Sequence, residues 1–385
     1  MPTKFEYDDA LNQLPVVDNC KEVHLPVMYR EVMKYFSYIK ETGGDIFDCT
    51  LGLGGHSSGL LRLLNQGNKG HLYSIDKDKR SIAIAEKKLK QIDPKGDQHS
   101  IIHGPYSKIS EYIYHMGLQG GDGFLFDFGV SSPQYDNPGR GFSYRFRGPL
   151  DMRMDQHDFV QVTAYDLCNS LMPEDLYEIF RTYSDEKFAR EIAFEIYKHV
   201  ITEGYIFSTD ELESVCIKVY NKHHYQAKHP ASKIFTALRV VVNSEFMEIQ
   251  RGLAGALEYT KIGGRVAVIT FSSEEDKIAM DVLKRYTTKR EEYWDEWSMP
   301  QDEQVPEFKW VCKKAFPKED EVERNPRSRS AILRVVERVN FQRTTLDPES
   351  YENVPYHIHE YVEAAREMKK KYFGKINKAF YPKRR

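Results

Sequence analysis

Short apolar runs alternate with amphipathic stretches through the first third of the chain. The apolar runs are bounded by glycine or charged residues and predict buried strands at residues 45–50, 71–75, 100–103 and 123–128. Between them, apolar residues recur at helical spacing over residues 57–66 and 81–91. Strands that alternate with helices in this way predict a parallel sheet with right-handed crossovers.

From about Met154 the pattern changes to helical periodicity alone. It predicts helices at residues 173–183, 185–200, 209–222 and 233–260. The strand pattern then returns at 265–271, followed by a helix at 276–286 and a last strand at 331–336. We therefore predict an α/β fold in which an all-helical block is inserted between the fourth and fifth strands of an open sheet.

These changes of pattern also predict the domain limits. We expect an acidic leader at residues 1–21 and a Rossmann-like domain made of residues 22–153 and 236–340. The inserted helical domain would be residues 154–235, and residues 341–385 would form a basic C-terminal appendage. The chain of 385 residues is long enough for one large core or two smaller ones.

Composition excludes several classes of protein. The chain has no apolar run long enough to span a membrane, so no membrane partner is expected. The leader is acidic and lacks an apolar core, which argues against a secretory or mitochondrial signal. The five cysteines are widely spread without a CxxC pair, so we expect neither disulfides nor a metal site. A cytoplasmic protein fits best, with an organelle matrix as the alternative, and a homodimer is compatible with the sequence.

The net charge of −3 does not indicate a nucleic-acid binder, but local charge does. Residues 366–385 hold nine Lys or Arg residues and one acid, with four aromatic residues among them. Such a segment suits a phosphate backbone with bases stacked on the rings. A solvated tail is the equally good alternative.

A glycine-rich loop follows the first predicted strand. The segment 48–56 reads Asp-Cys-Thr-Leu-Gly-Leu-Gly-Gly-His, and glycines at this place let a backbone approach a ligand closely. The loop lacks the GxGxxG spacing that suits a pyrophosphate, which disfavours a nicotinamide dehydrogenase. Asp76 ends the second strand, where a carboxylate accepts both hydroxyls of a ribose. The alternative for Asp76 is a solvent-exposed residue at a strand end.

A second loop, residues 127–134, follows the fourth strand and reads Asp-Phe-Gly-Val-Ser-Ser-Pro-Gln. Ligands of open α/β sheets bind at the carboxyl ends of the strands, so this loop should face the reacting group. It is similar to the Asp/Asn-Pro-Pro-aromatic loop of amino methyltransferases, whose chemistry requires an exocyclic amine to be held in line with a sulfonium. We therefore assign catalytic roles to Asp127, Ser132 and Pro133. A structural aspartate that caps a turn is the alternative.

Residues 140–155 are too rich in arginine and aromatic residues for an ordinary connection. We call this segment the arginine flap and predict that it grips phosphates and stacks on bases. The residues assigned to RNA are Arg140, Phe142, Arg145, Arg147 and Arg153. An ordered loop whose arginines pair with Asp151 and Asp155 is the alternative, and both hold if the arginines divide between the two roles.

At these stretches the sequence closely resembles the bacterial small-subunit ribosomal RNA cytosine-N4 methyltransferase family (RsmH, formerly MraW), which has a mitochondrial branch in animals. Further matching stretches, in the family's order, are residues 24–28, 103–107, 229–233, 237–245, 263–265 and 325–330. The resemblance implies a class I (Rossmann-like) methyltransferase fold with an inserted all-helical domain. It also implies S-adenosylmethionine as cofactor and, as substrate, a cytosine in the decoding centre of small-subunit (16S-type) ribosomal RNA or of the assembled subunit.

The resemblance carries the cofactor contacts of the family onto seven positions. They are Gly54, Gly55, His56, Asp76, Tyr106, Asp127 and Gln134. One departure lies near the site, where Ser272 replaces the histidine that the family usually has after the fifth strand. The lost histidine favours a catalytically silent RNA-binding or ribosome-assembly factor, whereas the intact Asp76, Asp127 and Gln134 favour an enzyme. An amino methyltransferase that acts on another nucleic acid is the third hypothesis.

Overall fold

The computed structural model describes residues 26–67, 69–156, 161–223, 229–288 and 306–340. Two compact units are formed, one from residues up to 129 and from 246 onward, and the other from residues 130–245. The arginine flap and the predicted insertion both belong to the second unit. The predicted leader and basic appendage lie outside the described residues, and the predicted domain limits stay a prediction.

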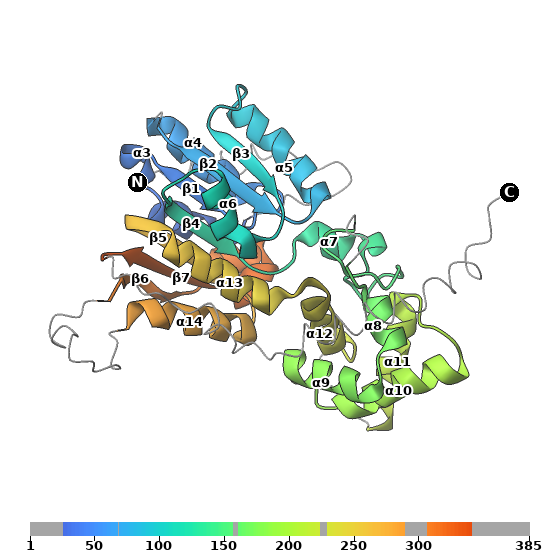
Figure 1. The fold of residues 1–385 in the computed structure, drawn as a ribbon. Helices are drawn as coiled ribbons and strands as arrows, with labels where there is room; N and C mark the ends of the chain where they lie inside the picture. The colour runs from blue at the N-terminus through green and yellow to red at the C-terminus, as the bar shows by residue number, and fades with distance from the viewer. Residues whose placement is uncertain (1–25, 68, 157–160, 224–228, 289–305, 341–385) are drawn as a thin grey trace. The chain divides into compact units, whose positions relative to one another are not determined.

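The first unit contains a seven-stranded sheet of order β3-β2-β1-β4-β5-β7-β6 (Figure 1). The strands are β1 (Asp45–Asp48), β2 (His71–Asp76), β3 (His99–His103), β4 (Gly121–Asp127), β5 (Thr260–Thr270), β6 (Phe308–Ala315) and β7 (Ile332–Arg338). Strands β1 to β5 are parallel, whereas β7 pairs antiparallel with both β5 and β6. Buried apolar residues fill β1 and β4, as expected of strands covered on both faces.

Helices cover both faces of this sheet. One face carries α2 (Tyr29–Tyr35), α3 (Ile39–Thr42), α4 (Gly55–Gly67) and α5 (Lys79–Ile92), whose apolar residues form one buried cluster. The other carries α6 (Ile109–His115), α13 (Glu245–Glu258) and α14 (Ser273–Thr287), which form a second cluster. Two apolar layers around a mostly parallel sheet confirm the predicted α/β class.

The second unit is built from helices. They are α7 (Ser132–Asp136), η2 (Pro138–Arg140), α8 (Ala164–Ser170), α9 (Pro173–Ser184), α10 (Ala189–Thr202), α11 (Thr209–Lys222) and α12 (Ser232–Asn243). Apolar stripes on α9 to α12 are buried, including Phe180, Ile192 and Leu238. In the described residues, only helices and irregular segments lie between β4 and β5, as the sequence pattern predicts.

The prediction of one long helix over residues 233–260 is wrong. The helix is interrupted at Ser244, which has φ 53° and separates α12 from α13. Beside the break, Arg239 donates two hydrogen bonds to the Glu245 carboxylate, of 2.8 and 2.9 Å. A serine in the left-handed backbone conformation costs free energy, and this buried ion pair across the break helps to stabilise that conformation.

The strand β6 was not predicted. Its residues mix lysines with Trp310 and Val311, and its pairing with β7 contains two irregularities, so no clean alternation marks it in the sequence. Before β7 come α15 (Glu319–Arg324) and η4 (Pro326–Ser330). Within the described part of the chain, no helix is long and apolar enough to cross a membrane.

Candidate functional site

Three aspartates lie at the carboxyl edge of the sheet in the first unit. Asp48 ends β1, Asp76 ends β2 and Asp127 ends β4, and these strands are neighbours in the order β2-β1-β4. Parallel strands bring their carboxyl ends to one edge, which in open α/β sheets is where ligands bind. The sequence positions of Asp76 and Asp127 therefore predicted correctly that they share an edge.

The glycine loop between β1 and α4 is shaped by its packing. Gly54 has φ 76°, and a Cβ there would lie 3.1 Å from the Cβ of Ala85. A Cβ on Gly55 would lie 3.0 Å from the Pro26 ring. Gly52, with φ 50°, is the one that faces open space, since the nearest atom to its Cβ position is the Thr50 carbonyl at 3.9 Å. The loop can therefore be approached most closely at Gly52.

Asp76 holds this loop in place. Its Oδ2 accepts a hydrogen bond of 2.7 Å from the Gly52 amide, and its Oδ1 accepts one of 2.8 Å from the Asp78 amide. Burial raises the pKa of Asp76 to about 6, although these two amides lower it. Each carboxylate oxygen has a second lone pair, so Asp76 retains the capacity to accept hydroxyl groups of a ligand.

Asp48 is fully buried below the loop. It accepts hydrogen bonds from the Ser57 hydroxyl, at 2.6 Å, and from the Thr50 amide, at 3.2 Å. Ser57 also contacts the Ser74 hydroxyl at 2.8 Å. Burial raises the pKa of Asp48 to about 6 against these bonds. A buried acid that is easier to protonate in the folded chain than in the unfolded chain stabilises the fold only at low pH.

We expect Asp48→Asn to flatten the pH dependence of stability. The folded pKa of about 6 exceeds the unfolded value of 3.8, so the wild type gains stability below pH 3.8 and loses it as pH rises through 6. Relative to the variant, the wild type should lose on the order of 3 kcal/mol between about pH 4 and pH 7. Urea unfolding of both proteins across this range measures the difference. Parallel curves would contradict a protonated Asp48.

Asp127 has the least satisfied carboxylate of the three. Its side chain is 22% exposed, yet its Oδ1 is buried and has no hydrogen-bond partner among the described residues. Burial raises the pKa of Asp127 well above its usual range, and the charges of Asp48 and Glu275 add to the effect. A buried oxygen without a partner indicates a place that a ligand completes.

His56 lies beside Asp127. Its Nε2 donates to the Val27 carbonyl at 3.0 Å, and its Nδ1 is 3.5 Å from Oδ2 of Asp127. A carbonyl only accepts, so Nε2 carries a hydrogen and Nδ1 is the nitrogen directed at Asp127. The ring is 5% exposed and stacks on Tyr29. The polar Nδ1 edge of the His56 ring therefore lies beside Asp127.

Tyr106 follows β3 at the same edge of the sheet. Its ring contacts those of Phe126 and Phe128, with centroids 5.7 and 5.9 Å apart. Gly252 of α13 leaves room for it, because a Cβ there would lie 2.4 Å from the Tyr106 ring. The amide of the next residue donates to Glu248. Tyr106 is therefore a fixed, partly buried aromatic surface.

The rest of the Asp127 loop belongs to the second unit. Gln134 is buried, and its Oε1 accepts a hydrogen bond of 2.9 Å from the Ser131 amide at the start of α7. Pro133 lies in the first turn of α7, where its missing N–H costs nothing. The side chain of Ser132 lies outside the described part of the structure. The catalytic and cofactor roles given to these residues stay predictions.

Ser272, which stands where the family has histidine, caps a helix. Its hydroxyl accepts from the Glu275 amide at 3.1 Å, and the Glu275 carboxylate accepts from the Phe271 and Ser272 amides. This capping box begins α14. The serine has gained a structural role that a histidine side chain fills poorly.

The arginines of the flap divide into two pairs. Arg140 is buried and donates to the carbonyls of Arg153 and Met154, at 3.2 and 2.9 Å. Arg153 makes a two-pronged contact with Asp151, through bonds of 2.9 and 2.8 Å. Phe142 is 3% exposed. These three side chains hold the flap together. Arg153 pairs with Asp151, as the alternative interpretation proposed, whereas Arg140 bonds to backbone carbonyls.

The other pair points to solvent. Arg145 and Arg147 are exposed, and Phe146 between them is 45% exposed. Arg147 lies 3.7 Å from Asp210, but its own side chain remains 76% exposed, so the contact is weak. This tip of the flap presents two cations around one aromatic ring.

Two side chains anchor the flap within the second unit. Asn243 donates to the Met152 carbonyl at 2.8 Å and accepts from the Met154 amide at 2.8 Å. Thr209 donates to the Phe146 carbonyl at 2.7 Å and accepts from the Gly148 amide at 3.0 Å. Neither role was predicted from the sequence. Asn243 stood in a matching stretch, which was the available signal.

Comparisons with known proteins identify the family of the chain. A sequence model of the MraW methylase family matches residues 21–339. The ribosomal RNA small subunit methyltransferase H of Mesoplasma florum is 42% identical over 319 residues, which are 82% of this chain and 99% of that protein. Among solved structures, an rRNA methylase from Streptococcus thermophilus is 9% identical with a TM-score of 0.33, over 80% of this chain and 95% of that one. An O-methyltransferase from Bacillus cereus is 8% identical with a TM-score of 0.35, over 87% and 88%. TM-scores this low add no weight to the sequence matches.

Proposed function

The chain belongs to the MraW methylase family, and on that premise we propose that it methylates the N4 amine of a cytosine in small-subunit ribosomal RNA, with S-adenosylmethionine as methyl donor. The observation that carries the proposal is the Asp127 carboxylate at the carboxyl end of β4, whose buried Oδ1 has no hydrogen-bond partner in the part of the chain that the structure describes. The cytosine would lie in the decoding centre, and the substrate would be the RNA or the assembled subunit. The compartment and a homodimer stay predictions.

The carboxyl edge fits the proposed cofactor chemically. When bound, S-adenosylmethionine supplies a methyl group on a positively charged sulfonium. Asp76 would accept the ribose hydroxyls, and Gly52 leaves the open approach that an adenosine needs. The three acids at this edge favour a cation, because a positive charge beside them relieves the cost of their burial. Gly54, Gly55, His56, Tyr106 and Gln134 remain the other proposed contacts.

Asp127 would position the amine and take its proton. Oδ1, which has no hydrogen-bond partner among the described residues, would accept an N–H of the cytosine amine and so turn the nitrogen lone pair away from the ring and toward the methyl group. With the donor bound, the methyl group would pass from the sulfonium sulfur to the nitrogen, and the methylated amine would then have to lose a proton. The raised pKa of Asp127 suits it to receive that proton.

The tip of the arginine flap would hold the RNA. Arg145 and Arg147 are exposed and suit two phosphates, and the half-exposed Phe146 suits a base. Arg140, Phe142 and Arg153, which were also assigned to RNA, would act by keeping the flap in shape.

We expect Arg145→Ala with Arg147→Ala to weaken RNA binding and reduce its salt dependence. Each lost phosphate contact should flatten the slope of log affinity against log salt by about one unit, so the double variant loses about two. Fluorescence anisotropy with labelled small-subunit RNA measures the slope. Arg153→Ala is the matched control, since it removes an internal ion pair and should lower stability instead. An unchanged slope in the double variant would make the flap purely structural.

Nucleoside mass spectrometry tests the activity itself. Small subunits lacking the modification, incubated with the purified protein and S-adenosylmethionine, should gain N4-methylcytidine. A protein that binds the cofactor and the RNA but transfers no methyl group would be the silent assembly factor that the loss of the histidine at Ser272 favours. Methylation of unrelated RNA or DNA at the same rate would instead support the third hypothesis.

A further inference from the structure

Basic residues lie between the last part of β6 and the start of β7, at the edge of the sheet where Asp127 lies. They come from the end of β6, the following loop and η4, and are all exposed: Lys313, Lys314, Lys318, Arg327 and Arg329. Phe316, in the middle of this stretch, is 58% exposed, and the Lys314 ammonium lies 4.8 Å from its ring centre. We call these six residues the basic edge strip.

The register of the sheet places the strip at the same height along the strands as Asp127. Asp127 pairs with Ile269 of β5, Ile269 with Leu333 of β7, and Leu333 with Ala315 of β6. Neighbouring strands are about 4.8 Å apart, so Ala315 lies roughly 14 Å from Asp127 across three strand spacings. Lys314 and Phe316 flank Ala315. At about 3.4 Å per stacked nucleotide, roughly four nucleotides span that distance.

The local fold directs the cations outward. Within η4, Ser328 is fully buried and its hydroxyl donates to the Asn325 carbonyl at 2.8 Å, whereas Arg327 and Arg329 on either side are exposed. Residues 325–330, Asn-Pro-Arg-Ser-Arg-Ser, are one of the stretches that resemble the family, and the proposed site does not use them. One serine fixes the turn and two arginines project from it.

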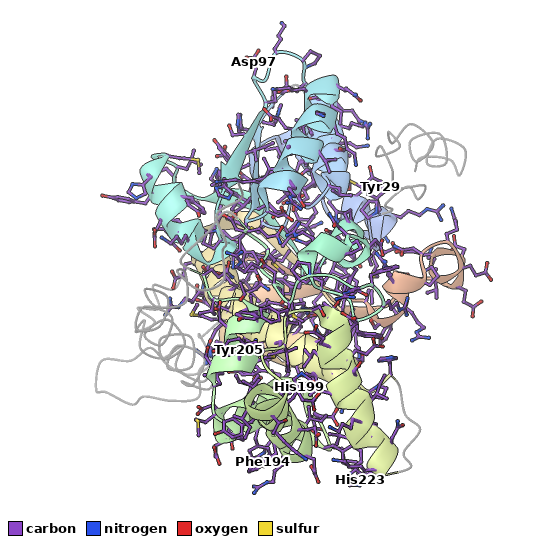
Figure 2. The ribbon with its side chains drawn as sticks, turned by 90° about the vertical axis from the view of Figure 1, so that its right-hand side faces the viewer. Tyr29, Asp97, Phe194, His199, Tyr205 and His223 are labelled. Atoms are coloured by element: carbon purple, nitrogen blue, oxygen red, sulfur yellow. The ribbon has the colours of Figure 1, made fainter. Side chains whose placement is uncertain are left out.

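The acids nearby have partners outside the strip: Asp276, on which the charge of Lys314 acts, pairs with Arg334 at 2.7 Å. In α15, Asp320 is engaged by Arg30 and Arg324, at 3.2 and 2.7 Å, and Glu321 accepts from the Met28 amide. Glu319 and Glu323 remain exposed, against five exposed cations. In Figure 2 the orange segment that contains α15 lies near the labelled Tyr29, and its side chains extend away from the ribbon.

We propose that the basic edge strip is a second RNA-binding surface, which holds the phosphates and one unstacked base of the strand that flanks the methylated cytosine. The proposal rests on the proposed function, since it takes the same RNA as partner. The lysines and arginines suit phosphates, and the exposed ring of Phe316 beside a lysine suits a stacked base. The strip belongs to the unit that carries Asp127, so it would fix the RNA relative to the reacting edge.

The experiment uses the full chain and two variants. Lys313→Gln/Lys314→Gln/Arg329→Gln removes three charges, and the salt slope for labelled decoding-centre RNA should fall by about two to three. Phe316→Ala should weaken binding of the same RNA roughly 5- to 100-fold with the slope unchanged. Lys87→Gln/Lys95→Gln/Lys284→Gln, on exposed positions of α5, the turn after it and α14, is the charge-matched control and should match the wild type. Calorimetric cofactor affinity, unchanged in all variants, reports that the fold is intact.

The outcomes separate this proposal from the function on which it rests. If the wild type neither binds nor methylates small-subunit RNA, the proposed function fails. If the wild type methylates RNA while the triple variant keeps the wild-type slope, only the strip proposal is overturned. Anionic lipid vesicles are the second probe: loss of vesicle binding by the triple variant, with the RNA slope retained, would overturn the proposal in favour of a membrane surface.

Discussion

Asp127→Ala should lower turnover about 10²- to 10⁴-fold while leaving the protein folded. A positioned acid–base group contributes on this order, and Asp127 is proposed both to orient the amine and to take its proton. Its Oδ1 makes no hydrogen bond within the described residues, so truncation breaks no internal contact of that atom. Single-turnover methylation and thermal unfolding of the same samples measure the two effects.

Asp122→Ala supplies the matched control for this result. Asp122 lies near the opposite end of β4, where it accepts from the Asp45 amide and pairs with Lys261, each at 2.8 Å. Its loss should cost stability but not turnover of the folded fraction. The catalytic role of Asp127 is wrong if its variant melts well below the wild type, or if it retains full turnover.

Asp76→Ala should weaken cofactor binding by about 2 to 4 kcal/mol, which is roughly 30- to 1,000-fold. Two charge-assisted hydrogen bonds to ribose would vanish together, and the Gly52 amide would lose its acceptor. Isothermal titration calorimetry measures the affinity. Asp93→Ala is the control, because Asp93 accepts from the Gly96 and Gln98 amides at the other end of α5. Equal affinity in wild type and Asp76→Ala would rule out the ribose contact.

A cofactor analogue without ribose hydroxyls separates the two effects of that variant. If Asp76 contacts the ribose, wild type should bind the analogue almost as weakly as the variant does, and the double change should add little. If Asp76 only holds the glycine loop, the variant should lose the same factor with either ligand. Additive losses would therefore assign Asp76 to the loop alone.

The parts of the fold that the sequence predicted are those with local signals. Strands β1, β2 and β4 carry apolar runs that end in glycine or aspartate, and each was found at its predicted place within a few residues. The break at Ser244 has no glycine or proline to mark it. It depends on the pairing of Arg239 with Glu245 and on what each helix packs against, which a periodic pattern does not contain.

The candidate site also divides into features that the sequence predicted and features that depend on tertiary contacts. The position of Asp127 after a buried strand predicted that it lies at the carboxyl edge of the sheet. That its Oδ1 has no partner among the described residues follows from the tertiary structure. The sequence assigned all four arginines of the flap to RNA, with internal pairing as the alternative, but could not say which arginine takes which role. The structure gives Arg140 and Arg153 internal partners and leaves Arg145 and Arg147 exposed. The number of charged residues can be read from a sequence. The role of each one depends on which carbonyl and carboxylate groups the fold places beside it.

The crowding of Asp48, Asp76 and Asp127 has a consequence for the lifetime of the protein in the cell. Burying these acids lowers the stability of the empty protein at neutral pH, because each has a raised pKa. A ligand that binds only the folded chain returns stability by mass action, by about 2.7 kcal/mol when it is present at 100 times its dissociation constant. The supply of methyl donor would then govern how much of the protein escapes proteolysis, as well as how fast it works.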